Sequence, residues 1–233
     1  MLTKEELEEV GPYRPDPVGI DKESLMTFLD AAFAFALTLT AYDIAVPVLT
    51  SGTDAALIEG LIQTIPQFMA YAFSFFMTII YWVLMRRAFS YFVKIDRVIL
   101  WLVIIFTFLI VASPFSAALL AGHPGNPSVY VFYGILGAIY TDIMIAIWWR
   151  GTSGYRLIHP DMPGETIKGM HRLFVLMLLP PVTVSIIAFF STQVAMFSII
   201  IFYVVFFAVS VMSPEERATG RRHFLHYIRG HRR

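Results

Sequence analysis

The sequence predicts an all-α integral membrane protein with six transmembrane helices and with both termini in the cytoplasm. Hydrophobic residues make up 58% of the 233 residues and charged residues only 15%, whereas a soluble domain carries about 25% charged residues. The apolar residues gather in long segments, each close to the ~20 residues that a helix needs to cross a bilayer. The Lys and Arg residues fall between these segments in a pattern that sets the orientation.

Six apolar segments are predicted to span the membrane. They cover residues 25–46, 61–85, 98–120, 128–149, 173–190 and 194–212. A β-barrel is excluded because its strands alternate apolar and polar side chains, whereas the stretch from Val98 to Val111 is apolar on every face except at Thr107. A helix satisfies its backbone polar groups within one segment, as the hydrocarbon region requires.

All 17 Lys and Arg residues fall on one side of this arrangement. They lie in the N-terminal tail, in the connections after the second and fourth spans, and in the C-terminal tail. The three opposite connections contain none, and an excess of Lys and Arg marks cytoplasmic loops. The first span is not expected to be a cleaved signal peptide, because an acidic tail with Glu5, Glu6, Glu8 and Glu9 precedes it.

The chain is predicted to form one membrane domain with two short tails. Residues 1–20 are a polar N-terminal tail, residues 21–213 are the six-helix transmembrane domain, and residues 214–233 are a basic cytoplasmic tail. The basic tail is consistent with an interfacial helix on anionic lipid or with a solvated segment that only fixes topology. Pro180 and Pro181 are expected to bend the fifth span.

Three carboxylates lie within the predicted spans, where ionisable groups are costly and suggest function. Asp43 lies near the outer end of the first span, and Asp142 lies well inside the fourth. Asp30 stands about two turns above the cytoplasmic end of the first span and needs a cation or several donors. Arg86 or Arg87, at the cytoplasmic end of the second span, is the expected partner.

The first span has two faces of different expected use. At helical spacing Phe35, Thr38 and Tyr42 share one face, which is expected to line an axis. Packing of Phe35 against lipid or its own core is the alternative. A second face is expected to pack inside the subunit, and its residues are Asp30, Ala34, Leu37 and Ala41.

Enzymatic chemistry is not expected. The sequence lacks H-E-x-x-H, G-x-S-x-G and P-loop motifs. It has no cysteine, and its six histidines lie in predicted connections and tails, so no cofactor and no resident metal are predicted.

The stretch Phe28-Leu29-Asp30-Ala31-Ala32-Phe33 resembles the opening helix of the prokaryotic transmembrane protein 175 family of potassium channels. The hallmark of that family is R-x-x-x-F-S-D, followed by an apolar helix that ends in an acidic residue and a Val-Pro step, here Asp43 and Val46-Pro47. The resemblance continues through Tyr71-Ala72-Phe73-Ser74-Phe75, Trp82, Asp96-Arg97, Leu100-Trp101 and Pro114-Phe115.

The departures from the family pattern concern the polar network at the first span. Ser24 stands where the family has the motif Arg, and Leu29 where it has the motif Ser. Met85-Arg86 replaces the usual histidine pair after Trp82, and Val103 replaces an Asn. Phe28, Asp30, Trp82 and Arg86 are therefore the expected family-motif and packing network, with Arg86 as the substitute cation.

The resemblance implies a homotetramer in a prokaryotic cell membrane, with the first helices around a central pore for K⁺ or related monovalent cations. By position, Phe35 would form the hydrophobic constriction, with Thr38 and Tyr42 beside it; K⁺ would bind there only in transit. One alternative is a non-conducting membrane scaffold of the same fold. Another is a proton-coupled carrier that uses Asp30 or Asp142, although the sequence shows no inverted repeats or broken mid-membrane helices.

Overall fold

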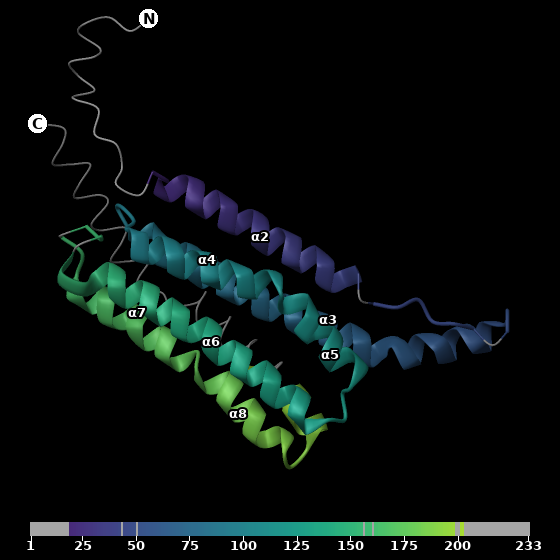
Figure 1. The fold of residues 1–233 in the computed structure, drawn as a ribbon. Coiled ribbons are helices and arrows are strands. Elements are labelled where there is room, and N and C mark those ends of the chain that lie inside the picture. Colours follow the sequence, from purple (N-terminus) through teal and green to yellow (C-terminus); the bar gives the residue numbers. More distant parts are fainter. Residues whose placement is uncertain are drawn as a thin grey trace, which may run out of the picture.

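The described part of the chain is a bundle of long helices joined by short connections (Figure 1). The computed structural model describes residues 19–42, 44–49, 51–155, 157–159, 161–198 and 201–202. The named α-helices are α2 (Lys22–Tyr42), α3 (Asp54–Ser90), α4 (Arg97–Val111), α5 (Ser113–Gly122), α6 (Pro127–Thr152), α7 (Gly164–Leu176) and α8 (Leu179–Ala188). A 3₁₀ turn covers Ser153–Tyr155, and residues 192–198 are again helical.

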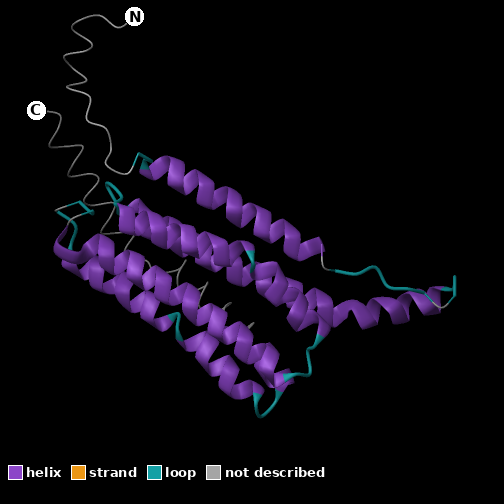
Figure 2. Ribbon diagram, viewed as in Figure 1, coloured by secondary structure: helices purple, strands orange, loops and turns teal. Residues whose placement is uncertain are grey.

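Figure 2 shows helices and loops without strands in these residues, which confirms the all-α class. An isolated antiparallel bridge joins Phe92 and Ile158. Five helical stretches are long and apolar enough to cross a membrane, with α4–α5 and α7–α8 each counted as one stretch. Most of the predicted sixth span, 194–212, lies outside the described residues, as do residues 1–18 and the basic tail.

Local sequence explains where several helices begin. The Asp21 carboxylate accepts a hydrogen bond from the Ser24 amide (2.6 Å) at the start of α2. Asp96 caps α4 by accepting from the Ile99 amide (2.9 Å), and Asn126 caps α6 ahead of Pro127. These side chains supply acceptors for amides that have no partner inside the first helical turn.

Two of the five stretches are interrupted at prolines. Helix α4 ends at Val111 and α5 begins at Ser113, with Pro114 in its first turn. The predicted bend at Pro180 and Pro181 appears as a break between α7 and α8, and both prolines lie in the first turn of α8. Proline lacks the amide that would continue the preceding helix. The fifth stretch also begins nine residues earlier than the predicted 173, at Gly164.

Helix α3 is longer than the predicted span of 61–85. Its 37 residues correspond to about 55 Å, against about 30 Å for the hydrocarbon core. Its N-terminal part projects beyond the other helices (Figure 1). The connection from α2 packs against this part, since a Cβ on Gly60 would lie 2.9 Å from Pro47 Cβ.

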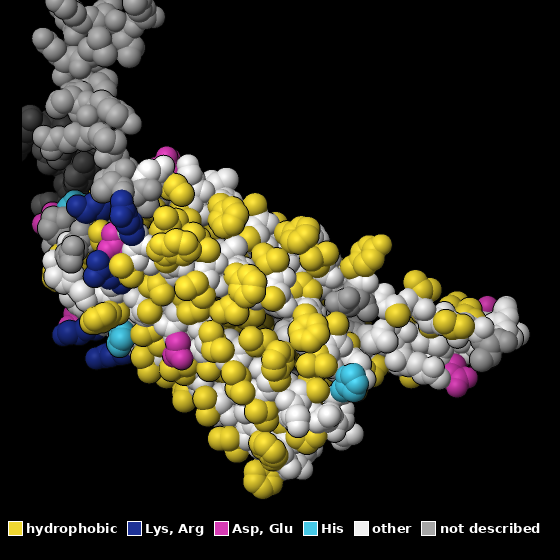
Figure 3. Space-filling model, in the orientation of Figure 1, with side chains coloured by type: hydrophobic (Ala, Val, Ile, Leu, Met, Phe, Trp, Pro, Cys, Tyr) yellow, Lys and Arg dark blue, Asp and Glu magenta, His cyan; other side chains and the backbone are white. Residues whose placement is uncertain are grey.

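The surface separates into an apolar middle and a basic end. Figure 3 shows hydrophobic side chains over most of the visible face and Lys and Arg gathered at one end of the bundle. This distribution is typical of a helix bundle surrounded by lipid, because a water-exposed surface would not carry so many large apolar side chains. Examples on different helices are Phe108 (73% exposed), Phe115 (65%) and Phe189 (69%).

Candidate functional site

Asp30 of α2 is held by two donors from α3. Trp82 Nε1 donates to Asp30 Oδ1 at 2.7 Å, and Arg86 Nη1 donates to Oδ2 at 3.3 Å. Of the two arginines considered from the sequence, the structure thus pairs Asp30 with Arg86. The Asp30 and Arg86 side chains are 36% and 50% exposed, so the pair is a partly open contact between two helices and not a buried charge.

The face of α2 that packs inside the subunit differs from the one expected. Its buried residues are Leu25, Met26, Leu29, Phe33, Ala36 and Thr40. Phe33 lies 6.0 Å from Phe106 between ring centroids, which joins α2 to α4. The expectation that Ala34 and Ala41 pack inside the subunit is wrong, because both are exposed. The larger apolar side chains of Leu29 and Phe33 fill the space between the helices and make more van der Waals contacts there than alanines would.

The opposite side of α2, which we call the open face, contains all three candidate constriction residues. Phe35 is 55% exposed, Tyr42 is 90% exposed, and Thr38 is exposed. The other exposed residues of the open face are Ser24, Thr27, Phe28, Ala31, Ala34 and Leu39. Thr38 donates to the Phe35 carbonyl (2.8 Å), which fixes the hydroxyl on the helix surface.

The remaining predicted site residues are more scattered. Phe28 is 55% exposed on the open face. Asp142 is exposed on α6, on the same helix face as Ile135 and Ile139. Asp43 lies outside the described residues. The structure therefore joins Asp30, Trp82 and Arg86 and leaves Phe28 apart from them.

A set of buried hydroxyls between α3 and α6 was not anticipated from the sequence. The Tyr81 hydroxyl donates to the Gly137 carbonyl (2.9 Å) and lies 3.0 Å from Thr141 Oγ1. Ser74 Oγ and the Tyr133 hydroxyl are 3.0 Å apart. The sequence did contain a signal for these contacts. Tyr130, Tyr133 and Tyr140 are spaced so that they lie on one side of a helix, and a buried tyrosine needs a hydrogen-bond partner for its hydroxyl.

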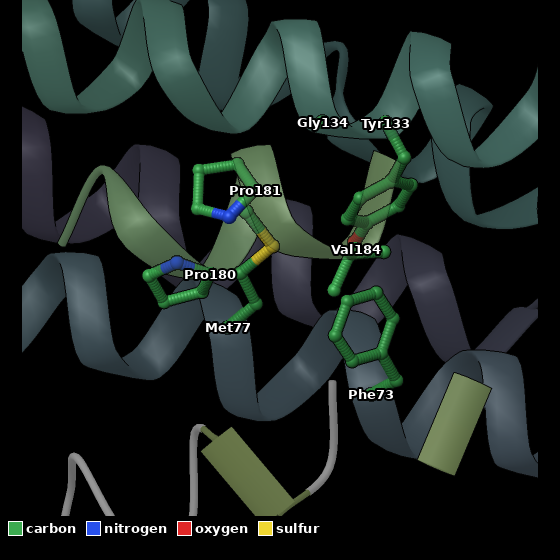
Figure 4. A pocket seen from close by; sticks show the side chains of 7 residues that line it. All are labelled: Phe73, Met77, Tyr133, Gly134, Pro180, Pro181 and Val184. Carbon is green, nitrogen blue, oxygen red and sulfur yellow. The ribbon is translucent and has the colours of Figure 1, made fainter. Parts of the chain in front are cut away.

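A small cavity lies beside these hydroxyls, where α8 crosses α6 (Figure 4). Its lining residues are Phe73, Met77, Tyr133, Gly134, Pro180, Pro181 and Val184. Gly134 and Gly137 allow the close approach, because a Cβ on Gly134 would lie 2.6 Å from the Pro181 carbonyl oxygen. The lining is apolar apart from Tyr133, so the cavity belongs to helix packing and offers no polar ligand site.

An ion pair joins the loop before α4 to the end of α6. Arg150 donates to Asp96 Oδ2 through Nε (2.9 Å) and Nη2 (2.7 Å). Partial burial opposes ionisation of Asp96, but the Ile99 amide and the Arg150 guanidinium outweigh it and lower the pKa of this carboxyl. Lys22 also bonds the Phe92 carbonyl (2.8 Å), so the basic end of the bundle is tied together by polar contacts.

The described residues contain no group of three or more His, Asp and Glu side chains that could hold a metal ion. Fold and surface together define a multi-pass α-helical membrane protein. Its distinctive features are an opening helix whose open face mixes aromatic, small and hydroxyl side chains, and a carboxylate bonded by Trp and Arg of the next helix.

Comparison with known proteins agrees with this description. The family model described as "Endosomal/lysosomal potassium channel TMEM175" matches residues 24–114, from the first turn of α2 to the start of α5. A protein of Streptomyces collinus named as a potassium channel is 28% identical over 156 residues, 64% of this chain and 73% of the relative. A second potassium channel, of Chamaesiphon minutus, is 28% identical over 134 residues, 56% of this chain and 66% of the relative.

The fold is also similar to a solved structure. The crystal structure of a lysosomal potassium-selective channel TMEM175 homolog from Chamaesiphon minutus superposes with a TM-score of 0.71 at 19% identity, covering 81% of this chain and 97% of that one. The family model and the two relatives support the transmembrane protein 175 (TMEM175) family for this chain, and the solved structure shares its fold.

Proposed function

We propose that this protein is a potassium-permeable cation channel of a prokaryotic cell membrane, assembled as a homotetramer with helix α2 of each subunit around the pore. The observation that carries this proposal is the open face of α2, which turns Phe35, Thr38 and Tyr42 away from the subunit's own core. The two relatives named as potassium channels support the choice of ion.

The chemistry of the open face favours a shared axis over lipid. Where the neighbouring α4 is exposed, it carries large apolar side chains such as Trp101, Ile105 and Phe108. The open face of α2 carries Phe28, Phe35 and Tyr42 as well, but alternates them with Thr27, Ala31, Ala34 and Thr38. Small residues permit close helix approach in lipid, and hydroxyls are better placed beside water than beside acyl chains.

The projecting part of α3 supports an assembly of several copies. Counting about 20 residues from Arg86 toward the N-terminus reaches Pro66, so the preceding turns lie outside the hydrocarbon core. This part nevertheless presents an apolar row, which we call the projecting stripe. Its residues are Leu57, Ile58, Leu61, Ile62, Ile65 and Phe68, each 43–59% exposed. Because lipid does not reach most of this stripe, a neighbouring subunit is the partner that we propose for it.

Phe35 forms the constriction in this proposal, and Thr38 and Tyr42 lie beside it toward the outer end. Four phenyl rings about an axis close a pore by excluding water. The Asp30–Trp82–Arg86 cluster fixes the rotation of α2 against α3, so that the open face points to the axis. Phe28 lies on the same face, nearer the basic end.

The proposed topology has six spans with both termini in the cytoplasm. The basic end of the bundle, which includes Arg86 and Arg150, faces the cytoplasm by the charge rule. Residues 194–212 supply the sixth span, and residues 1–20 and 214–233 are the cytoplasmic tails on either side of the membrane domain.

Potassium flux from liposomes tests the channel proposal. Purified wild type is expected to release K⁺, and Phe35→Ala to release it severalfold faster because the ring that excludes water is gone. Phe108→Ala is the matched control, since Phe108 is an equally large exposed ring on α4, and it should behave as wild type. Absence of flux from both wild type and Phe35→Ala would overturn the proposal.

A non-conducting scaffold of the same fold is the second candidate. The observation that favours it is the bulk of Phe35 and Tyr42 on the open face, which is large enough to keep a shared axis shut. A stable tetramer that passes no K⁺ even after Phe35→Ala and Tyr42→Ala together would support the scaffold.

A further inference from the structure

Helix α7 is amphipathic, and its cations point away from the bundle. It buries Met170 and Phe174 against the subunit, and Phe174 packs edge-on against Trp148 at 5.9 Å between centroids. Lys168, His171 and Arg172 are all exposed. Lys168 and Arg172 are one turn apart, at the spacing that makes two side chains neighbours on a helix surface.

The exposed face of α7 changes from charged to apolar within one turn. Val175 and Leu176 follow Arg172 in α7 and are 44% and 50% exposed, and Leu179, the first residue of α8, is 47% exposed. Apolar side chains at this exposure are suited to acyl chains, and Lys and Arg are suited to the headgroup region. The boundary between headgroups and hydrocarbon therefore passes between Arg172 and Val175.

Two hydrogen bonds place the α7 cations at the level of the bundle's basic end. Trp148 Nε1 donates to the Ile167 carbonyl (3.3 Å), which sets the first half of α7 beside the end of α6. Arg150, two residues further along α6, bonds Asp96 at the start of α4. Trp149 is 65% exposed at this level, as expected for an aromatic side chain at a membrane interface.

The acidic residue of this helix does not neutralise the surface. Glu165 contacts Lys168 at 3.2 Å, but the two side chains are 82% and 65% exposed. An exposed pair of this kind holds its partners weakly, so Lys168 can turn to another anion. Arg172, one turn further into the membrane, has the fork of donors that suits a phosphate.

We propose that Lys168 and Arg172 bind the phosphate of an anionic phospholipid, with Val175, Leu176 and Leu179 against its acyl chains. The shift from cations to apolar residues on one helix face favours a phospholipid over a soluble phosphate, which would use only the charged half. This lipid site goes beyond the proposed function and is independent of conduction.

Native mass spectrometry tests the site. The full chain in detergent is mixed with equimolar phosphatidylglycerol and phosphatidylcholine, and the lipids that stay bound after release from the detergent are identified by mass. Wild type is expected to retain phosphatidylglycerol in preference. The double variant Lys168→Gln and Arg172→Gln should lose about 25-fold in that preference, since each basic residue near an anionic lipid contributes roughly fivefold. Lys94→Gln, another exposed cation at the basic end, is the matched control and should retain it.

Two further measurements separate the possible causes of a change. Arg172→Lys keeps the charge and should keep most of the preference for phosphatidylglycerol. A variant with a fold defect would instead differ from wild type in its elution volume on a size-exclusion column. Added millimolar inorganic phosphate should not displace the lipid; if it does so completely, the site takes soluble anions and the proposal fails. Equal retention of the two lipids by wild type, or an unchanged preference in the double variant, would also overturn it.

Discussion

Asp30 sits between two donors of different kinds, and their contributions can be separated by substitution. Asp30→Asn keeps an oxygen that can accept from the Trp82 indole but removes the attraction to Arg86. Because both charged side chains are partly exposed, the ionic coupling should be at most about 1 kcal/mol.

We expect Asp30→Asn and Arg86→Gln each to lower the unfolding temperature in detergent, and the double variant to be no worse than the more severe single one. Trp82→Phe should add most of its own loss to that of Asp30→Asn, since the Asn oxygen still accepts the indole hydrogen bond. If the losses in unfolding temperature from Asp30→Asn and Arg86→Gln simply add in the double variant, the ion pair contributes nothing to stability.

Asp96 gives a prediction about pH. Its pKa is lowered in the folded protein by the Ile99 amide and Arg150, against the opposing effect of partial burial. A carboxyl with a lowered folded pKa contributes its stability above the unfolded value of about 3.9 and loses it as the pH falls through the folded value. Asp96→Asn should therefore cost about 1–2 kcal/mol near pH 7. The difference from wild type should begin to shrink near the unfolded value of about pH 4 and keep falling as the pH drops through the lowered folded pKa.

The measurement for Asp96 is the unfolding temperature of both proteins from pH 3.5 to 8. Asp161→Asn is the control, because the Asp161 side chain is 87% exposed and lies 3.5 Å from the His159 ring in a long contact. A wild-type advantage that persists unchanged at pH 3.5 would contradict the assigned role of the Asp96 carboxylate.

At the scale of helices, α6 and α8 depend on the absence of side chains at Gly134 and Gly137. A Cβ on Gly134 would collide with Ser185 Oγ and with the Pro181 carbonyl, whereas one on Gly137 would lie 3.0 Å from Pro181 Cβ. The Pro181 backbone cannot turn away, so Gly134→Ala should destabilise the protein by about 1–3 kcal/mol.

Gly122→Ala is the control for this helix contact, because a Cβ there would have no atom within 4 Å. Unfolding temperatures in detergent should show a clear loss for Gly134→Ala and little change for Gly122→Ala. Equal behaviour of the two variants would mean that α8 moves away from α6 at little cost.

The apolar length of each segment predicted the helical spans well, but not where the helices end. Hydropathy marks only the part of α3 that fits the bilayer, so the prediction began at 61, whereas the Thr53 cap starts the helix at Asp54. The amphipathic start of α7 was missed for the same reason, since its mixed face has low hydropathy. The break before Pro180 was predictable because proline acts locally.

Within α2, helical spacing correctly grouped the exposed Phe35, Thr38 and Tyr42 but did not identify the packed face. Spacing defines which residues share a side of a helix, and not which side meets a neighbour. The pairing of Asp30 with Arg86 could be anticipated because an antiparallel neighbour brings its basic end close. The tyrosine hydroxyls at positions 81, 133 and 140 could not, because their partners are backbone carbonyls and hydroxyls on other helices.

At the scale of the whole molecule, the projecting stripe gives a prediction about assembly. Ile58 and Leu61 are 58% and 52% exposed within one subunit, so lysine at these positions does not disturb the subunit's own core. In the proposed tetramer, four copies of the projecting segment surround the axis that the α2 helices define, because the connection from α2 packs against this segment.

We therefore expect Ile58→Lys with Leu61→Lys to convert the proposed tetramer to smaller species, measured as mass by light scattering in detergent. Gln63→Lys adds the same charge to another exposed position of the segment and should remain a tetramer. A wild-type protein that is monomeric would remove the shared axis altogether. A tetramer that survives both lysines would show that the subunits meet through α2 and the membrane part of α3, with the projecting segments apart.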